Sequence, residues 1–519
     1  MMVFISYFNS PQLVLLLLAS LCFITSLVFQ SKGKANLAVV FLFLTAILVF
    51  SFAALLDPFL NLWDERFHAL VAKNLMHHPL MPTLYDNPIV NMDYDRWDRF
   101  HIWIHKQPLF LWQIALSFKL FGISEFTLRI PDVVLGAIFV LICYRSGKLL
   151  VNQKVGYISG VLVISTIYIL ELIGGRQELD HNDFSFMVYI SLSIWSFIEY
   201  YFSKNKIWIF FIGLFSGFAI LCKWIVGLLI YFGWAVLNLQ HKKFRVSENR
   251  DLFVALLVTV LIALPWQILT FIWYPTEAIT AYKFNLLHFS NPLDGHSGTV
   301  WYHFTVFDSI YGALGSFLIL PSFYLLRKKM KDNRLYYSLL SMVVVVYLFF
   351  SFTATKMPSF TIIVSMVIFI AFATLFDILI EFITKTVNKA FLKKICFVVP
   401  VIILVLLRFN IQTLQEKHSL WNKENSYSQM LTYNKGVFKS LKLPSNTVLF
   451  NIKGRHYIEA MFYTGLPAYN IIPSIKQYEE LKERGWRIAV FKSSDHEIPG
   501  YLKDDSKVII INKEIKGDE

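Results

Sequence analysis

The chain has 519 residues, of which 56% are hydrophobic, 17% are aromatic and 16% are charged. Its charges fall in blocks between apolar runs of membrane-spanning length, which excludes an ordinary soluble protein and indicates a polytopic membrane protein. The net charge of +13 is spread over many separate loops. It therefore reflects membrane topology and contact with anionic lipid headgroups, and nucleic acid is not expected as a partner.

About twelve apolar segments each have roughly the length that a helix needs to cross the ~30 Å hydrocarbon layer. They lie near residues 12–30, 36–56, 131–150, 155–172, 184–202, 207–222, 224–240, 252–272, 303–326, 335–352, 358–381 and 395–411. The sequence therefore predicts an all-α polytopic membrane protein, with residues 1–411 as its transmembrane part.

Lysine and arginine are divided unevenly between two alternating sets of short loops. The richer set contains Lys32, Lys34, Arg145, Lys148, Lys154, Lys204, Lys206, Lys242, Lys243, Arg245, Arg250, Arg327, Lys328, Lys329, Lys331, Arg334, Lys385, Lys389, Lys393 and Lys394. The poorer set contains Arg176, Lys223, Lys283 and Lys356. The positive-inside rule puts the richer set in the cytoplasm, so segments 57–130, 173–183 and 273–300 and both chain ends are expected outside.

The first external segment begins with NLWDERFHALVAKNL. Trp63, Phe67 and Leu70 follow a helical spacing, and Asp64 and Glu65 fall in the first turn, where the macrodipole favours negative charge. The carboxylates have two interpretations, a solvated helix start or part of a reactive site at the membrane edge.

Two basic residues frame the second half of this segment. Lys106 precedes the apolar stretch Leu109–Phe118, which is too short to cross a membrane and predicts a helix lying in the interface. Arg129 comes just before Pro131 and the next span. Each cation either anchors a helix end in the interface or faces a lipid phosphate.

The second external segment, GGRQELDHNDF, lies between two spans. It contains Arg176, Glu178, Asp180, His181 and Asp183 within one short turn, and three carboxylates there exceed what solvation requires. We therefore expect this turn to contribute to a site on the same membrane face.

The third external segment contains HFSNPLDGHSGTVWYH. His288, His296 and His303, with Asp294, are candidate metal ligands, although their spacing matches no standard zinc pattern. Hydrogen bonding to substrate and ordinary interfacial histidine are the alternatives.

Several motifs resemble one known class. These are Trp63-Asp64-Glu65-Arg66, HKQPLFLW, SFKLFGISEFTLRIPDVVLGAI, the Arg-then-Asp turn of the second segment, GFAILCKWIVG around Lys223, and Thr355-Lys356-Met357-Pro358. They resemble those of the GT-C membrane glycosyltransferases, which include protein O-mannosyltransferases and, closer in pattern, the bacterial 4-amino-4-deoxy-L-arabinose lipid A transferases. The resemblance covers roughly residues 55–360, and it departs from the usual pattern where His105 replaces an acid and Gln107 a proline.

The resemblance implies a GT-C-like fold and a transferase that takes a sugar from a polyprenyl-phosphate donor to a glycolipid or protein acceptor. It implies an integral protein of the bacterial inner (plasma) membrane with its site facing the periplasm or exterior. The implied catalytic carboxylates are Asp64, the general base, and Glu65, with Asp180 and Asp183 as alternatives for the carboxylate of the second segment. The implied donor-phosphate ligands are Lys106, Arg129 and Arg176, and the implied substrate-binding residues are His105, His288, His296 and Lys356. No cofactor is certain, but a divalent metal at Asp64, Asp180 and His288 is compatible with this pattern.

The remaining residues, 412–519, change character. TVLFNI, AYNIIP, RIAVFKS and KVIIINK are typical of short strands, and HYIEAMFYTG and IKQYEELKERG of helices between them. They predict a small external α/β domain that either covers the site or helps to recognise the acceptor.

Two other functional classes fit a polytopic chain. A transporter or flippase for a lipid-linked sugar predicts ionisable residues within spans and broken helices near the midplane, whereas here the carboxylates cluster in loops on one face. A structural membrane subunit predicts that Asp64, Lys106 and Asp180 can vary without loss of activity.

Overall fold

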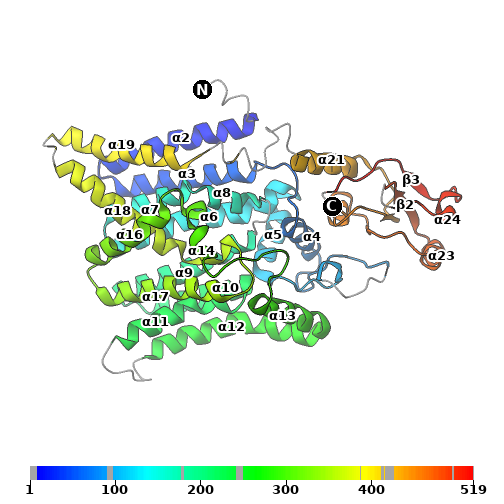
Figure 1. Cartoon of the computed structure of the whole chain (residues 1–519), viewed down its shortest axis with the longest axis horizontal. Coiled ribbons are helices and arrows are strands. Elements are labelled where there is room, and N and C mark those ends of the chain that lie inside the picture. Colours follow the sequence, from blue (N-terminus) through cyan, green and yellow to red (C-terminus); the bar gives the residue numbers. More distant parts are fainter. Residues whose placement is uncertain are drawn as a thin grey trace.

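The structure is a computed structural model that describes residues 9–90, 97–176, 181–240, 249–385, 387, 389–410, 414, 426–493 and 496–517. Figure 1 shows a bundle of long helices on one side and a small part containing the strands on the other. Segments that follow the first two helices, drawn in blue and cyan, lie between these two parts.

The bundle consists of helices connected by short loops. They are α2 (Ser10–Ser31), α3 (Ala35–Ala54), α6 (Glu125–Leu150), α7 (Gln153–Ile164), α8 (Ile167–Gly174), α9 (His181–Ser203), α10 (Ile207–Lys223), η2 (Ile225–Leu228), α11 (Leu229–Leu239), α12 (Arg250–Trp273), α14 (Tyr302–Thr305), α15 (Phe307–Tyr311), α16 (Gly315–Lys329), α17 (Asn333–Phe352), η4 (Pro358–Val364), α18 (Ser365–Lys385) and α19 (Ala390–Arg408). Each of the twelve predicted apolar segments is mostly helical where the structure describes it, although those near 155–172, 224–240 and 303–326 contain non-helical residues.

Six of these helical stretches are long and apolar enough to cross a membrane, or up to eight if each bent pair counts as one span. The shorter apolar helices include α10 and the stretch Ile225–Leu239. The chain is therefore an integral membrane protein with a mostly helical fold, and the number of twelve crossings stays a prediction.

Two predicted spans are bent rather than straight. The pair α7 and α8 bends by 52°, and the pair formed by Tyr302–Tyr311 and α16 bends by 86°. At the second bend Gly312 and Leu314 have φ angles of 96° and 68°, which a continuing right-handed helix does not allow. Hydropathy does not reveal such bends, because both halves of each pair are apolar.

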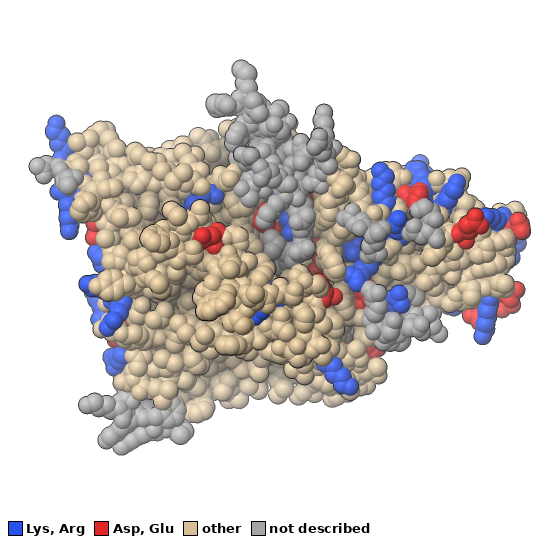
Figure 2. Space-filling model, viewed as in Figure 1, with Lys and Arg blue, Asp and Glu red and all other residues tan. Residues whose placement is uncertain are grey.

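The cytoplasmic loops predicted from the positive-inside rule meet at one end of the bundle. Lys206 pairs with Asp251 at 3.6 Å, and Lys329 pairs with Glu381 at 2.9 Å, so the ends of four different helices lie together there. Figure 2 shows basic side chains along this edge, on the left of the view. The loops of the other set meet at the opposite end, where they build the site described below.

The first external segment folds into short elements at that opposite end. They are α4 (Asp64–Leu75), η1 (Trp97–Arg99) and α5 (Pro108–Phe121). Helices α4 and α5 have the positions that the sequence predicts for interfacial helices, and α5 ends at Gly122, whose φ of 83° stops it. Their depth relative to a membrane stays a prediction.

The third external segment is mainly a helix rather than a loop. Residues Pro275–Ser290 form α13, which begins with proline in its first turn, a position that tolerates the missing N–H group. The sequence predicts only an external segment here, although Pro275 and the aromatic residues of AYKFNLLHF are compatible with a helix.

The C-terminal residues contain a three-stranded parallel sheet in the order β1-β2-β3. The elements are α21 (Ser426–Ser440), β1 (Thr447–Phe450), α22 (Tyr457–Thr464), α23 (Ile475–Glu483), β2 (Arg487–Phe491), α24 (Gly500–Lys503) and β3 (Ile509–Ile511). The predicted strand AYNIIP is not a strand of this sheet, but it runs beside β1, where Ala468 forms a bridge with Leu449 and the Tyr469 N–H donates to the Leu449 carbonyl at 2.8 Å. That residues 412–519 form a separate domain stays a prediction.

This C-terminal part packs against the first external segment. Arg66 of α4 pairs with Glu459 at 3.6 Å, and the Lys73 ammonium donates to the Phe462 carbonyl at 2.8 Å. The α22 helix therefore packs against α4.

Candidate active site

Asp64 and Lys106 form an ion pair at the bundle end where the external segments meet. The Lys106 Nζ donates to the Asp64 Oδ2 at 2.9 Å. Asp64 is the first residue of α4, and Lys106 lies two positions before α5. Their side chains remain 26% and 15% exposed, so both groups are accessible to a ligand.

Glu65, the next residue, points into the protein instead. Its carboxylate is buried and accepts hydrogen bonds from the Arg129 Nε at 2.8 Å and Nη2 at 3.1 Å. The Asn61 backbone N–H donates to the same carboxylate at 2.5 Å. Burial by itself raises the pKa of Glu65, but the charge of Arg129 and the hydrogen bond from His181 hold it well below its usual range. Glu65 is therefore an ionised structural partner of Arg129.

Arg129 uses all its N–H groups inside the protein. Besides Glu65, it donates to the carbonyl oxygens of Ala54, Asp57 and Phe59 at 2.7 to 2.9 Å. These bonds occupy the five donors of a guanidinium group. A donor phosphate could contact Arg129 only by breaking them, so this arrangement does not support its expected role as a phosphate ligand.

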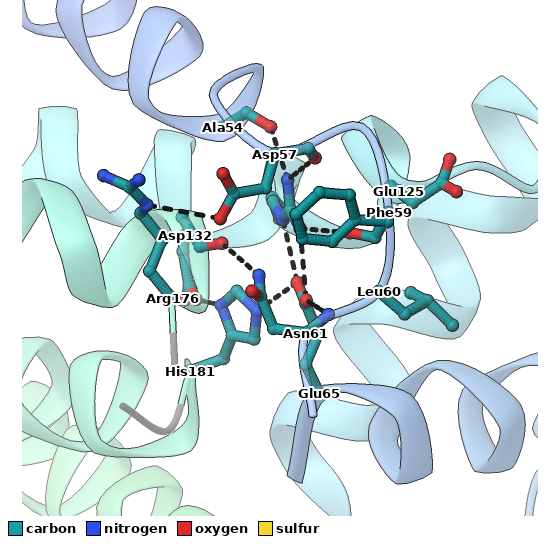
Figure 3. Close-up of polar contacts among 12 residues, drawn as sticks. Ala54, Asp57, Phe59, Leu60, Asn61, Glu65, Glu125, Asp132, Arg176 and His181 are labelled. Carbon is teal, nitrogen blue, oxygen red and sulfur yellow. Dashed lines mark hydrogen bonds and ion pairs between the residues drawn. The ribbon is translucent and has the colours of Figure 1, made fainter. Parts of the chain in front are cut away.

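His181 links Glu65 to a second carboxylate. Its Nε2 lies 2.9 Å from a Glu65 oxygen, and its Nδ1 lies 3.0 Å from an Asp132 oxygen. Figure 3 shows the ring between these two groups. Two carboxylates on the two ring nitrogens favour the doubly protonated imidazolium. The sequence does not predict this contact of Asp132, because the residue lies within the apolar run RIPDVVLGAI.

Arg176 belongs to the same buried layer. Its Nε donates to the Asp57 carboxylate at 3.2 Å, a contact that Figure 3 shows. Its Nη1 donates to the Leu414 carbonyl at 2.9 Å. The side chain is only 1% exposed. Arg176 therefore holds the end of α3 and does not face Lys106. Asp180, the candidate beside it in sequence, lies outside the described residues.

Asp183 of α9 and Lys223 of α10 form a second acid and cation pair. Asp183 is buried and accepts hydrogen bonds from Lys223 and from the Ser359 hydroxyl. Lys223, the last residue of α10, keeps a quarter of its side chain exposed. Its motif was noticed in the sequence, but the residue was not included among the candidate site residues.

His288, His296 and Lys356 lie together, although they come from separate segments. The Lys356 N–H donates to the His296 carbonyl at 3.2 Å, and the His288 Nδ1 lies 3.0 Å from the Thr355 hydroxyl. Burial lowers the pKa of His288 to about 4, and the charges of Lys223 and Lys106 act in the same direction. Both lysines therefore act on one neutral imidazole, which lies near the two acid and cation pairs.

The ammonium of Lys356 itself faces away from this space. It is buried and donates to the carbonyl oxygens of Phe350 and Ser351, at 2.9 and 2.6 Å. These carbonyls belong to the last turn of α17, where a cation is favourable. Lys356 thus holds the end of a helix, and this does not support direct contact with substrate.

Trp63 and Trp224, which adjoin Asp64 and Lys223 in the chain, have unusual backbone angles. Trp63 precedes Asp64 with φ 63° and ψ −127°, and Trp224 follows Lys223 with φ 69° and ψ −165°. Such angles cost a non-glycine residue about 1–3 kcal/mol and persist only where neighbouring contacts impose them. The strained turns fix the directions in which Asp64 and Lys223 leave their helices.

The described residues contain no group of three or more His, Cys, Asp or Glu side chains that could hold a metal ion. Asp64 and His288 both interact with Lys106, and the third residue of the expected metal set, Asp180, lies outside the described residues. His105 stacks on Trp97 with ring centroids 4.2 Å apart, next to Lys106.

Two comparisons of the sequence with known proteins found partial matches. Residues 105–269 match the family described as dolichyl-phosphate-mannose-protein mannosyltransferase. A protein of Aquifex aeolicus (strain VF5) is 26% identical over 161 residues. That alignment covers 31% of this chain and 29% of the relative, so the similarity spans less than a third of the relative's length.

Solved structures match over most of the chain. ArnT from Cupriavidus metallidurans bound to undecaprenyl phosphate has a TM-score of 0.60 at 14% identity, covering 86% of this chain and 88% of that one. The oligosaccharyltransferase AglB from Archaeoglobus fulgidus, with an inhibitory peptide and a dolichol-phosphate, has a TM-score of 0.51 at 12% identity, covering 83% of this chain and 64% of that one. The chain therefore has the fold of the GT-C membrane glycosyltransferases, the class that its motifs resemble.

Proposed function

We propose that the protein is a membrane glycosyltransferase that moves a sugar from a polyprenyl-phosphate donor to an acceptor. The observation that carries this proposal is the accessible pair of Asp64 and Lys106, 2.9 Å apart. A second pair, Asp183 and Lys223, is linked to it through His288, whose pKa is lowered by the charges of both lysines. An acid and a cation side by side are what a transfer from a phosphate ester to a hydroxyl group needs.

In the proposed reaction, the bond between the anomeric carbon and the phosphate oxygen breaks, and the acceptor oxygen bonds to that carbon. Asp64 takes the proton of the acceptor hydroxyl, and polyprenyl phosphate leaves with its negative charge held by Lys106. The free protein pairs these two groups with each other. A bound phosphate would take over Lys106 and so release the Asp64 carboxylate as a base.

We propose Lys223 as the second ligand of the donor phosphate. It replaces Arg129 and Arg176, which the motif resemblance implies for this role. It is partly exposed and lies near His288, whereas both arginines are buried and bonded to protein acceptors. Positive charge in a partly dry site is worth several times its value in water. Asp183 would position Lys223, and Glu65 would position α4 through Arg129.

The donor class is supported by the relatives. One structural relative was solved with undecaprenyl phosphate and another with a dolichol-phosphate. We propose that the reaction takes place at the periplasmic or exterior face of a bacterial inner membrane. A glycolipid acceptor, such as lipid A or another envelope glycolipid, is preferred because of the motif resemblance, and a protein hydroxyl is the second acceptor class.

Mass spectrometry of envelope lipids and glycoproteins from cells with and without the gene tests this proposal. A glycolipid that loses one sugar, and regains it when the wild-type gene is restored but not Asp64→Asn, is the expected result. An unchanged set of glycolipids and glycoproteins contradicts the proposal.

The transporter alternative is favoured by one observation. The bundle contains two bent helix pairs, and Glu171 is buried in α8, directly after the first bend. A flippase predicts that a fluorescent lipid-linked sugar crosses proteoliposome membranes without transfer of its sugar. Sugar transfer without such movement favours the enzyme.

A further inference from the structure

A cavity of about 270 Å³ lies beside the Asp64 and Lys106 pair and is not used in the reaction described above. It is lined by Trp97, Phe100, His105, Thr280, Ala281, Phe284, Asp294 and Arg455. These residues come from the first external segment, from α13 and its following loop, and from the C-terminal part. Three regions far apart in the sequence therefore build one pocket.

The walls of the pocket are aromatic. Trp97 and His105 stack with nearly parallel rings, 11° apart in orientation, and Phe284 packs against His105 at 5.5 Å. Rings of this kind provide rigid apolar surfaces at low cost in conformational entropy.

The polar groups of the pocket have opposite charges. Asp294 is exposed and makes no hydrogen bond or ion pair within the described residues. The Arg455 Nε donates to Asp98 at 2.8 Å, and its terminal amino groups make no hydrogen bond to the part of the chain that the structure describes. The pocket thus offers hydrogen-bond acceptors from Asp294 and hydrogen-bond donors from Arg455. These two charges balance, so the pocket has no excess of positive charge that would select a phosphate.

We propose that this cavity binds one saccharide ring of a substrate. The C–H faces of a sugar ring are apolar and pack on aromatic walls, while its hydroxyl groups both donate to a carboxylate and accept from a guanidinium group. The volume lies just below the range of about 300–1,000 Å³ that drug-sized ligands occupy, as expected for a single ring.

The position of the pocket agrees with this assignment. His105 is the residue before Lys106, and Arg455 lies over the ring of Trp63, the residue before Asp64, at 5.0 Å. A ring bound here lies next to both reacting groups. The assignment rests on the proposed function only for the identity of the molecule that carries the sugar, which is either the acceptor or the donor.

Saturation-transfer NMR tests the pocket without requiring catalysis. The full chain in lipid nanodiscs would be mixed with methyl glycosides of mannose, glucose and N-acetylglucosamine. We expect saturation transfer to at least one glycoside in the wild type, and a loss of several-fold or more in both Phe284→Ala and Asp294→Ala. Lys283→Ala, an exposed neighbour on α13 that does not line the cavity, is the matched control and should keep the signal.

No saturation transfer in the wild type, or equal signals in all variants, overturns the proposal. Bare undecaprenyl phosphate added to the mixture should leave the glycoside bound, and displacement by it overturns the proposal because the pocket would then hold a phosphate. Undecaprenyl-phosphate mannose separates the two sources, since it displaces the glycoside only if the pocket holds the donor sugar. Glycoside binding without any sugar transfer contradicts the proposed function and leaves the pocket standing.

Discussion

The ammonium of Lys106 lies 2.9 Å from the Oδ2 of Asp64, although 42 positions separate the two residues in the chain. The pair is partly exposed, whereas the adjacent Glu65 is buried against Arg129. Neighbouring carboxylates thus have different environments, and each gives a different expected result on substitution.

Asp64→Asn should reduce transfer by about 10²–10⁴-fold, the usual contribution of a general base, without loss of folded protein. The reason is that the amide keeps the size of the side chain but cannot take a proton. Initial rates and size-exclusion profiles in detergent measure the two effects. Asp86→Asn, an exposed carboxylate of the same external segment, is the matched control and should keep wild-type rates. A rate within a few-fold of wild type for Asp64→Asn removes this carboxylate from the mechanism.

Lys106→Gln should weaken binding of undecaprenyl phosphate by about 10–100-fold. This corresponds to the ~1.5–3 kcal/mol typical of one hydrogen bond to a charged group. Lys119→Gln, the basic residue in the last turn of α5, is a control that keeps the affinity. Microscale thermophoresis in detergent gives both values, and equal affinities for the two variants exclude Lys106 as the phosphate ligand.

The difference between Asp64 and Glu65 shows what the sequence could and could not reveal. Successive residues of a helix point about 100° apart, so the two carboxylates of an adjacent pair can meet different surroundings. The motif identified both residues, but no pattern in the sequence determined which one turns inward. The buried partners of Glu65 are Arg129 and His181, and the latter lies 116 positions away.

The helices were largely predictable because apolar runs of membrane length leave few other structures. Bends at Gly312 and the helix α13 were not predicted, because local backbone angles and partly polar helices leave little trace in hydropathy. The sequence does not predict the proposed role of Lys223 for a related reason. This role depends on the position of His288, which only the folded chain brings close.

Glu65→Gln should destabilise the protein, since it leaves the buried Arg129 without its charged partner. Removing one member of a buried ion pair costs about 3–5 kcal/mol. The folded-state pKa of Glu65 is lowered, so this stability is present above the ordinary carboxyl pKa of 4.5 and is lost as the pH falls below it. Thermal unfolding by intrinsic fluorescence should therefore show a large gap between wild type and variant at pH 7 that narrows below about pH 4.5. A gap that is small at pH 7, or grows in acid, contradicts the structural role of Glu65.

His288 should not contribute an ionisation to the pH profile of the rate near neutrality. Its pKa is lowered to about 4 by burial and by the charges of Lys223 and Lys106, so the ring is neutral throughout the range from pH 5.5 to 8. His288→Gln should therefore keep the shape of the wild-type profile, even if its rate is lower. Lys223→Met removes one of the two cations but leaves the ring buried beside Lys106. It should therefore raise the His288 pKa only part of the way from about 4, and the acid limb of the profile should move to higher pH than in the wild type. The absence of this movement in Lys223→Met, checked against the double variant with His288→Gln, contradicts the proximity of the two residues.

Glu459→Ala should loosen the contact between the C-terminal part and α4. The Glu459 carboxylate lies 3.6 Å from Arg66 and 2.8 Å from the His456 ring, and both Arg66 and Glu459 are buried, so the substitution leaves a buried guanidinium group without its counter-charge. Limited proteolysis should then cleave the variant after residue 411 several-fold faster than the wild type. Glu480→Ala is the matched control, because Glu480 pairs with Lys476 at 3.9 Å on the exposed surface of α23, where such a pair contributes about 0–1 kcal/mol. Cleavage of Glu459→Ala at the rate of Glu480→Ala would show that the two parts are held together by other contacts, such as the one between Lys73 and the Phe462 carbonyl.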